Sequence, residues 1–207
     1  MIPLEDGRAT LRPIIAAHVP ADAAEARDQA AMLAFIDAHA DCLGRTNPLG
    51  HFTGSALVFD PAGRLLLLWH RKLERWLQPG GHSEPEEHDP IATALREAHE
   101  ETGLTDLAPL GVGPLDLDIH RIPGRGDEAA HDHLDVRYAL LTRQPEAAMV
   151  SVESRELRWF GPDALGGLGL DAALWRAVEK GRRRLADAQP TASLSSPSSS
   201  SSPSPRM

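Results

Sequence analysis

Apolar residues along the chain fall into short runs and alternations that predict a β-sheet. Residues 51–59 and 64–69 are two mostly apolar runs. The segment between them, Asp60-Pro61-Ala62-Gly63, has proline second and glycine fourth, as in a type I turn. This pattern predicts a β-hairpin. Residues 115–122 and 133–141 alternate apolar and polar side chains, which predicts two half-buried antiparallel strands.

Helical patterns are expected on both sides of these strands. Residues 21–40 are rich in alanine and carry apolar residues at helical spacing, so they predict an amphipathic helix. The apolar stretch before it, residues 12–20, is expected to be extended. Residues 156–160 predict one more short strand, and residues 171–185 predict a closing helix whose basic end favours the helix dipole.

The segment from Asp89 to Gly103 carries the clearest helix signals. Asp89 is a good N-cap, and Pro90 suits the first helical position because an N–H there has no partner within the helix. Gly103 can adopt the left-handed conformation that ends many helices. A helix is therefore expected over residues 90–102.

Length and composition are those of one globular domain with extensions. The chain has 207 residues, 42% of them hydrophobic and 25% charged, and no apolar run reaches the roughly 18 residues of a membrane span. The formal net charge of −9 argues against DNA binding through the whole surface. The start lacks the basic and apolar regions of a secretory signal, and the single Cys42 cannot build a disulfide framework, so a cytoplasmic protein is expected.

Three carboxylates lie in the last turns of the 90–102 helix. Glu97, Glu100 and Glu101 are spaced i, i+3 and i+4 and so share one helix face. Like charges at these spacings destabilise an exposed helix by roughly 0.2–0.5 kcal/mol per pair, and the negative end of the helix dipole adds to the repulsion. The cluster is either a solvated acidic face or a ligand set for a divalent cation, whose charge would turn repulsion into coordination.

The residues around this cluster resemble the box motif of the Nudix hydrolases. That box has Gly, five residues, Glu, seven residues, and then Arg-Glu-apolar-any-Glu-Glu-any-Gly-apolar. This chain has Gly81 and Glu87, followed by REAHEETGL at residues 96–104, which matches the second half at every defined position. The resemblance covers about residues 51–185. It implies an α/β fold, an α/β/α sandwich around a mixed β-sheet.

The first half of the box departs from the family pattern by one residue. Eight residues instead of seven separate Glu87 from Arg96, because His88 precedes the Asp89-Pro90 helix start. The insertion lies in the loop, so the register of the helix glutamates is unaffected. It leaves open whether Glu86 or Glu87 takes the place of the supporting acid of the box.

The resemblance implies an enzyme that uses water and Mg²⁺, or Mn²⁺, to cleave a pyrophosphate bond in a nucleoside diphosphate linked to another group. The residues that correspond to metal ligands are the carbonyl of Gly80 and the carboxylates of Glu97, Glu100 and Glu101. Arg96 corresponds to the box arginine that holds a box carboxylate in place, and Gly81 and Glu87 to residues that support the ligands. One of the three glutamates is also expected to help activate water.

Other polar residues are candidates outside the box. Some Nudix enzymes take a further ligand or base from a loop before the late tryptophan strand. Glu153 is the catalytic candidate there and Glu156 the next, against the alternative of a solvated loop acid. If the two alternating strands pair, their Asp, His and Arg residues share one face. The candidates for substrate binding are His82, Arg71, Asp135 and Arg137.

These inferences define a domain organisation and two hypotheses. We expect an N-terminal extension with an amphipathic helix at residues 1–47, a Nudix hydrolase domain at 48–187 and a disordered Ser/Pro-rich tail at 188–207. The expected binding partner is a small nucleotide-type diphosphate substrate, and no binding to membranes or DNA is expected. The protein is expected to be a monomer or a homodimer. The alternative is a non-catalytic Nudix-like domain that binds a nucleotide and has a regulatory role. The intact carboxylates favour the enzyme, while the box leaves the substrate open.

Overall fold

The structure is a computed structural model that describes residues 7–71, 73–124, 126, 129–151 and 154–189. The tail predicted for residues 188–207 lies outside these ranges from residue 190 onward, and so does Glu153. In the described part of the chain, no helix has the length and the apolar character needed to cross a membrane.

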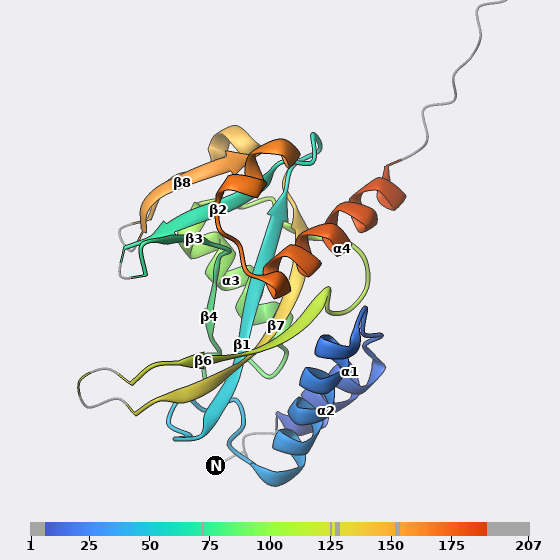
Figure 1. The fold of residues 1–207 in the computed structure, drawn as a ribbon, viewed down its shortest axis with the longest axis vertical. Helices are drawn as coiled ribbons and strands as arrows, with labels where there is room; N and C mark the ends of the chain where they lie inside the picture. The colour runs from blue at the N-terminus through green and yellow to red at the C-terminus, as the bar shows by residue number, and fades with distance from the viewer. Residues whose placement is uncertain (1–6, 72, 125, 127–128, 152–153, 190–207) are drawn as a thin grey trace, which may run out of the picture.

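The strands form one mixed sheet with the order β3-β2-β1-β7-β5, in which β4 also pairs with β1, β6 with β7, and β8 with β2 (Figure 1). The strands are β1 (Gly50–Phe59), β2 (Leu65–His70), β3 (Arg75–Leu77), β4 (Gly80–His82), β5 (Ala108–Pro109), β6 (Asp116–Ile122), β7 (His131–Leu141) and β8 (Ser154–Phe160). The predicted hairpin is confirmed as the antiparallel pair β1 and β2. The two alternating segments are confirmed as the antiparallel pair β6 and β7.

Strand β1 is the centre of the sheet. It runs parallel to β7 over ten residue pairs, from Gly50 opposite Asp132 to Phe59 opposite Leu141, and every residue of β1 is buried. A strand that is buried on both faces reads as a nearly continuous apolar run, as residues 51–59 do.

The helices cover both faces of this sheet. They are α1 (Arg8–Ala17), α2 (Ala23–Ala38), α3 (Pro90–Thr102) and α4 (Ala172–Ala188), with short 3₁₀ helices η1 (Pro145–Ala147) and η2 (Pro162–Gly167). The bounds predicted for α3 are confirmed: Asp89 accepts a hydrogen bond from the Ile91 N–H, and Gly103 ends the helix with φ +70°.

The expectation that residues 12–20 are extended is wrong, because α1 continues to Ala17. Pro13 lies inside this helix and removes the hydrogen bond to the Ala9 carbonyl, at a cost of about 3 kcal/mol. Leu11 and Ile15, one helical turn apart, are fully buried in the core that also contains residues of α2. Burying two such side chains contributes about 1.5–3 kcal/mol each, which offsets the proline.

Two apolar clusters separate the layers. The first joins α1, α2 and α3 to Phe52, Ala56 and Val58 on one face of β1, and the second joins α4 to Leu57 and Phe59 on the other face. Figure 1 shows α4 crossing one face of the sheet, α3 behind the other, and α1 and α2 beside β6. The three layers form the predicted α/β/α sandwich.

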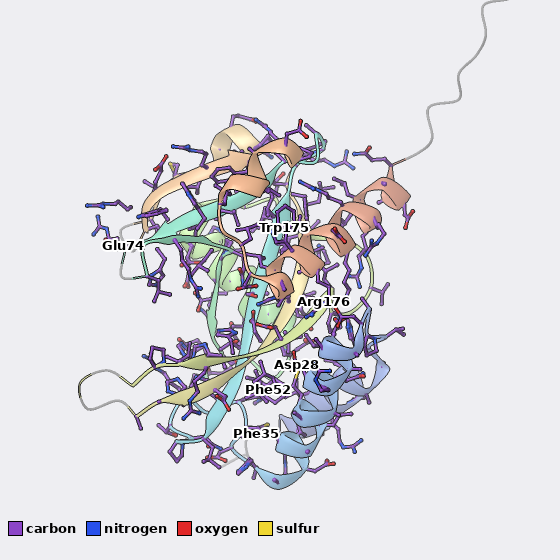
Figure 2. The ribbon with its side chains drawn as sticks, in the orientation of Figure 1. Asp28, Phe35, Phe52, Glu74, Trp175 and Arg176 are labelled. Atoms are coloured by element: carbon purple, nitrogen blue, oxygen red, sulfur yellow. The ribbon has the colours of Figure 1, made fainter. Side chains whose placement is uncertain are left out.

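Helix α2 docks on the outer edge of β6 through two acidic side chains. The N–H of Leu117 donates to Glu25 (3.1 Å) and the N–H of Ile119 donates to Asp28. Arg176 of α4 donates to the Leu117 carbonyl (3.0 Å). Figure 2 shows Asp28 and Arg176 where α2, β6 and α4 meet. Glu25 and Asp28, three residues apart on the helix, thus match Leu117 and Ile119, two residues apart on the strand. Three outward backbone groups of the edge strand are satisfied in this way.

Glu25 is the buried anchor of this contact. Its side chain is fully buried and accepts hydrogen bonds from the Ala21 N–H (2.6 Å) and Lys180 Nζ (2.5 Å), while His18 Nε2 lies 2.7 Å away. Burial alone raises the pKa of this carboxyl. The hydrogen bonds from His18, Ala21 and Lys180 together lower it by more than burial raises it, so the net pKa falls well below the ordinary value. Glu25 is therefore charged in the folded protein.

Replacing Glu25 with Gln should lower the free energy of unfolding by about 3 kcal/mol, because it removes one partner of a buried ion pair. Chemical denaturation measures this change. Asp37→Asn on the same helix is the matched control, since its pair with Arg12 is exposed at both side chains and contributes at most about 1 kcal/mol. Equal losses in both variants would contradict the role of Glu25 as an anchor.

The same anchor predicts an acid sensitivity. Because the folded-state pKa of Glu25 is depressed, its contribution is fully present above the unfolded pKa of about 4.3 and is lost as the pH falls below it. The free energy of unfolding of the wild type should therefore fall more steeply than that of Glu25→Gln between about pH 5 and pH 3. Denaturation series at several pH values compare the two slopes, and parallel curves would count against the shift.

Candidate functional site

Two glycines let helix α3 pack closely on strands β1 and β4. A Cβ at Gly54 of β1 would lie 2.4 Å from the Pro90 carbonyl oxygen and 2.9 Å from Thr93 Cβ, so the start of α3 packs directly on the β1 backbone. A Cβ at Gly81 of β4 would lie 2.3 Å from an oxygen of Glu97. Only residues without a side chain allow these approaches.

Arg96 is the hub of the site, in the sense that its side chain donates hydrogen bonds to several of the groups around it. Its Nε donates to Glu87 (2.8 Å), and its Nη1 donates to Glu97 (3.0 Å) and Glu100 (3.1 Å). Its Nη2 donates to the His82 carbonyl (2.7 Å) and to Glu87 (3.1 Å). Hydrogen bonding to Glu87, followed by the effect of Glu97, raises the pKa of Arg96 above its already high value. One permanent cation thus ties three carboxylates and strand β4 into one arrangement.

The structure places Glu87, and not the exposed Glu86, against Arg96. Glu87 also accepts from Thr93 Oγ1 (2.9 Å) and from the Glu84 N–H (3.0 Å). Burial alone raises the pKa of Glu87, but the bonds from Arg96, Glu84 and Thr93 lower it, so the net pKa is below the ordinary value. The loop that contains the extra residue closes as a turn, with the Glu87 N–H bonded to the Glu84 carbonyl (2.9 Å).

The three box glutamates line the side of α3 that faces β4 and solvent. Glu101 accepts a hydrogen bond from the Gly80 N–H (3.0 Å), Glu97 is largely buried beside Gly81, and Glu100 is exposed. This donor set consists of carboxylate oxygens, the ligands that Mg²⁺ prefers, and so it fits the ion. The ligand role of the Gly80 carbonyl stays a prediction.

Three of the other sequence candidates lie apart from this arrangement or outside the structure. Glu153 is not among the described residues. Glu156 lies on β8 and forms an ion pair with Arg158. Arg71 is exposed just after the end of β2. None of these positions tests the roles predicted for them.

Asp135 and Arg137 are buried within the sheet instead of facing an open site. Asp135 accepts from Thr53 (3.0 Å), Ser55 (2.8 Å) and Arg137 Nε (3.0 Å). Arg137 also donates to Asp118 (2.7 Å) on the neighbouring strand β6. The predicted sharing of one face by the polar residues of β6 and β7 is therefore confirmed. The atoms of Asp135 and Arg137 named above are occupied within the protein, so they form a structural network, and substrate binding by them stays a prediction.

His82 belongs to a cluster of rings that sequence reasoning missed as a group. Its ring centroid lies 4.9 Å from that of His51 and 5.1 Å from that of His133. Burial, reinforced by the neighbouring histidines, lowers the pKa of His51 to about 4 and that of His133 to about 2. The signal in the sequence was a row of polar residues at alternate positions of β1, 51, 53 and 55, but their partners come from other strands.

Known protein sequences match much of the chain. A family model described as the NUDIX domain matches residues 51–183. A curated relative from Lactococcus lactis subsp. cremoris (strain MG1363), named probable DHNTP pyrophosphohydrolase, is 35% identical over 111 residues, which is 53% of this chain and 64% of the relative. The match thus spans less than two thirds of that relative's length.

Two solved structures are similar to the chain. A C. elegans Ap4A hydrolase in a binary complex matches with a TM-score of 0.50 and 19% identity, over 66% of this chain and 98% of that chain. A Nudix hydrolase from M. smegmatis, RenU, matches with a TM-score of 0.49 and 22% identity, over 68% and 89%. At 19% identity, the first of these structures shows a shared fold alone.

Gly81→Ala should displace the Glu97 carboxylate, because the added Cβ would overlap its oxygen, while the flexible side chain can move without unfolding the protein. We expect Mg²⁺ affinity to fall by about 10-fold or more, as for other changes that misplace a metal ligand. Calorimetric titration measures the affinity, and circular dichroism checks the fold. The control is Gly166→Ala, where nothing lies within 4 Å of the added carbon. Equal Mg²⁺ affinity in the two variants would contradict the predicted displacement of Glu97.

Proposed function

Since the chain belongs to the NUDIX domain family, we propose that it is a hydrolase that cleaves a pyrophosphate bond with the help of Mg²⁺ or Mn²⁺. The observation that carries the proposal is the arrangement around Arg96, which joins Glu87, Glu97 and Glu100 to strand β4 while Gly80 holds Glu101. A solvated acidic face needs no such hub. A ligand set does, because like charges have to be kept close together before the cation arrives.

In this proposal the ion is held by carboxylates of α3 and by β4. Its ligands are Glu97, Glu100, Glu101 and the Gly80 carbonyl. When bound, the ion neutralises phosphate charge and makes a bound water more acidic. Arg96 keeps the carboxylates in register, and Glu87 in turn keeps Arg96 in place through two hydrogen bonds. One of the three box glutamates accepts the proton of the attacking water.

The proposed substrate is a nucleotide-type diphosphate linked to another group. The name of the Lactococcus relative makes DHNTP one compound to test. The exposed Arg71 is a candidate for contact with phosphates, because a guanidinium binds phosphate oxygens in bidentate fashion. Glu153 keeps its proposed role as an additional ligand or base.

Glu101→Gln should lower kcat by roughly 10²–10³-fold, the scale for losing one charged group that stabilises the transition state. The neutral amide is a poor Mg²⁺ ligand, but it can still accept the Gly80 N–H, so the fold should persist. Steady-state kinetics with Mg²⁺ measures the loss. Glu86→Gln is the control, because Glu86 is exposed. A nearly normal rate for Glu101→Gln would remove Glu101 from the site.

A substrate panel tests the proposal as a whole. Purified full-length protein with Mg²⁺ is incubated with DHNTP, dinucleoside polyphosphates, ADP-ribose, nucleotide sugars, coenzyme A and oxidised nucleoside triphosphates, and both products are identified by chromatography. We expect cleavage of a pyrophosphate bond in one class and none without metal. Tight binding of one compound with no cleavage of any would contradict the enzyme and support a regulatory nucleotide-binding domain.

A further inference from the structure

Three neighbouring strands bring three histidines together on one face of the sheet. His51 lies on β1, His82 on β4 and His133 on β7, and β1 pairs with both of the other strands. Each side chain offers one ring nitrogen, and these nitrogens all lie within 4.8 Å of one another. His51 and His133 are direct partners across the parallel ladder. The cluster is therefore fixed by the sheet and does not depend on a loop.

Two of these rings have buried nitrogens without protein partners. His51 is 1% exposed. Within the part of the chain that the structure describes, neither of its ring nitrogens has a hydrogen-bond partner, and His133 Nε2 has none either. A neutral imidazole has one N–H donor and one lone pair. Leaving such groups buried and unsatisfied destabilises the folded state, and native proteins rarely do so without a reason.

We propose that His51, His82 and His133 bind one divalent transition-metal ion of the Zn²⁺ class, at a site separate from the box glutamates. Neutral imidazole suits Zn²⁺, Co²⁺, Ni²⁺ and Cu²⁺, whereas Mg²⁺ prefers oxygen ligands. The ion's bonds to His51 and His133 would use ring nitrogens that have no hydrogen-bond partner among the described residues.

The rings need only a small adjustment to close on an ion. Zn–N bonds of about 2.0–2.1 Å in a tetrahedral site put ligand nitrogens about 3.3 Å apart, and here they lie within 4.8 Å. Two more histidines surround the site: His131 stacks on His51 at 5.0 Å and His120 lies 5.5 Å from His133, centroid to centroid. Water or one of these rings completes the fourth position.

This ion would stabilise the strand that supports the box carboxylates. Side chains alternate along a strand, so Gly81 faces Glu97 on α3 while His82 projects from the opposite face of β4. The His82 carbonyl accepts from Arg96 (2.7 Å), and β4 pairs with β1 through only three residue pairs. A bond from His82 through the ion to β1 and β7 would therefore hold β4 in place for Arg96.

Zn²⁺ binding to the full chain tests the proposal. Equilibrium dialysis with elemental analysis should find one tightly bound Zn²⁺ in the wild type, in Glu101→Gln and in His99→Gln, whose histidine is exposed on α3. His51→Gln and His133→Gln should each weaken binding by more than about 100-fold, beyond the loss expected from a merely supporting residue. Equal binding by all five proteins, or none by the wild type, would overturn the site.

A second measurement needs no variant and covers the case in which a buried substitution prevents folding. Co²⁺ added to the metal-free wild type should give the visible absorption of a tetrahedral nitrogen-ligated ion, and Zn²⁺ should shift the ring-nitrogen NMR signals of three histidines. Zn²⁺ should also raise Tm, since a ligand that binds only the folded state stabilises it. Shifts in exposed histidines alone, with Tm unchanged, would contradict the proposal.

Because Glu101→Gln removes the proposed Mg²⁺ ligand without touching the histidines, its Zn²⁺ binding separates the two ideas. Retained Zn²⁺ binding with lost hydrolysis supports two distinct sites. Loss of both in Glu101→Gln would mean that Zn²⁺ binds at the box glutamates, and the histidine site would then be wrong.

Discussion

The parallel pairing of β1 with β7 is the contact on which the rest of the structure depends. Ten consecutive residue pairs fix the register of two strands that are far apart in the sequence, and a slip of one residue would turn every side chain to the other face. In the observed register, His51, Thr53 and Ser55 lie beside His133, Asp135 and Arg137. The same register leaves Gly54 on the opposite face, where α3 packs.

Arginines organise the charged groups on both faces of the sheet. Arg96 joins Glu87, Glu97 and Glu100 beside β4, while the buried Arg137 joins Asp118 and Asp135 on the other face. Burying charge is costly unless each ion finds several partners, and a planar guanidinium supplies five N–H donors. The two sets differ in exposure: Arg137 is buried inside the protein, whereas the Arg96 set includes the exposed Glu100.

The N-terminal helices contribute to the sheet as well as to the core. Glu25 and Asp28 accept two outward N–H groups of β6, and Lys180 and Arg176 of α4 contact the same edge. An unpaired edge strand is an aggregation hazard, and here two helices cover it. Residues 8–38 therefore pack as part of the folded unit, although the family match begins at residue 51.

The sequence by itself determined the features that rest on local interactions. Asp89, Pro90 and Gly103 set the ends of α3 because caps act within a few residues, and Asp60 to Gly63 set the β1–β2 turn for the same reason. The box glutamates share one helix face because their spacing in the sequence matches the turn of a helix. Only tertiary structure decided that α1 is helical in spite of Pro13, since burial of Leu11 and Ile15 comes from distant partners.

Tertiary structure also decided which polar residues meet. Spacing could not choose between Glu86 and Glu87, because the choice depends on how the loop closes on Arg96. The meeting of His51 with His82 and His133 depends on strand pairing between residues far apart in the sequence, for which a single chain carries no local signal. Short-range hydrogen bonds depend on neighbouring residues in the sequence. The register of strands far apart in the sequence is fixed only when the whole core packs.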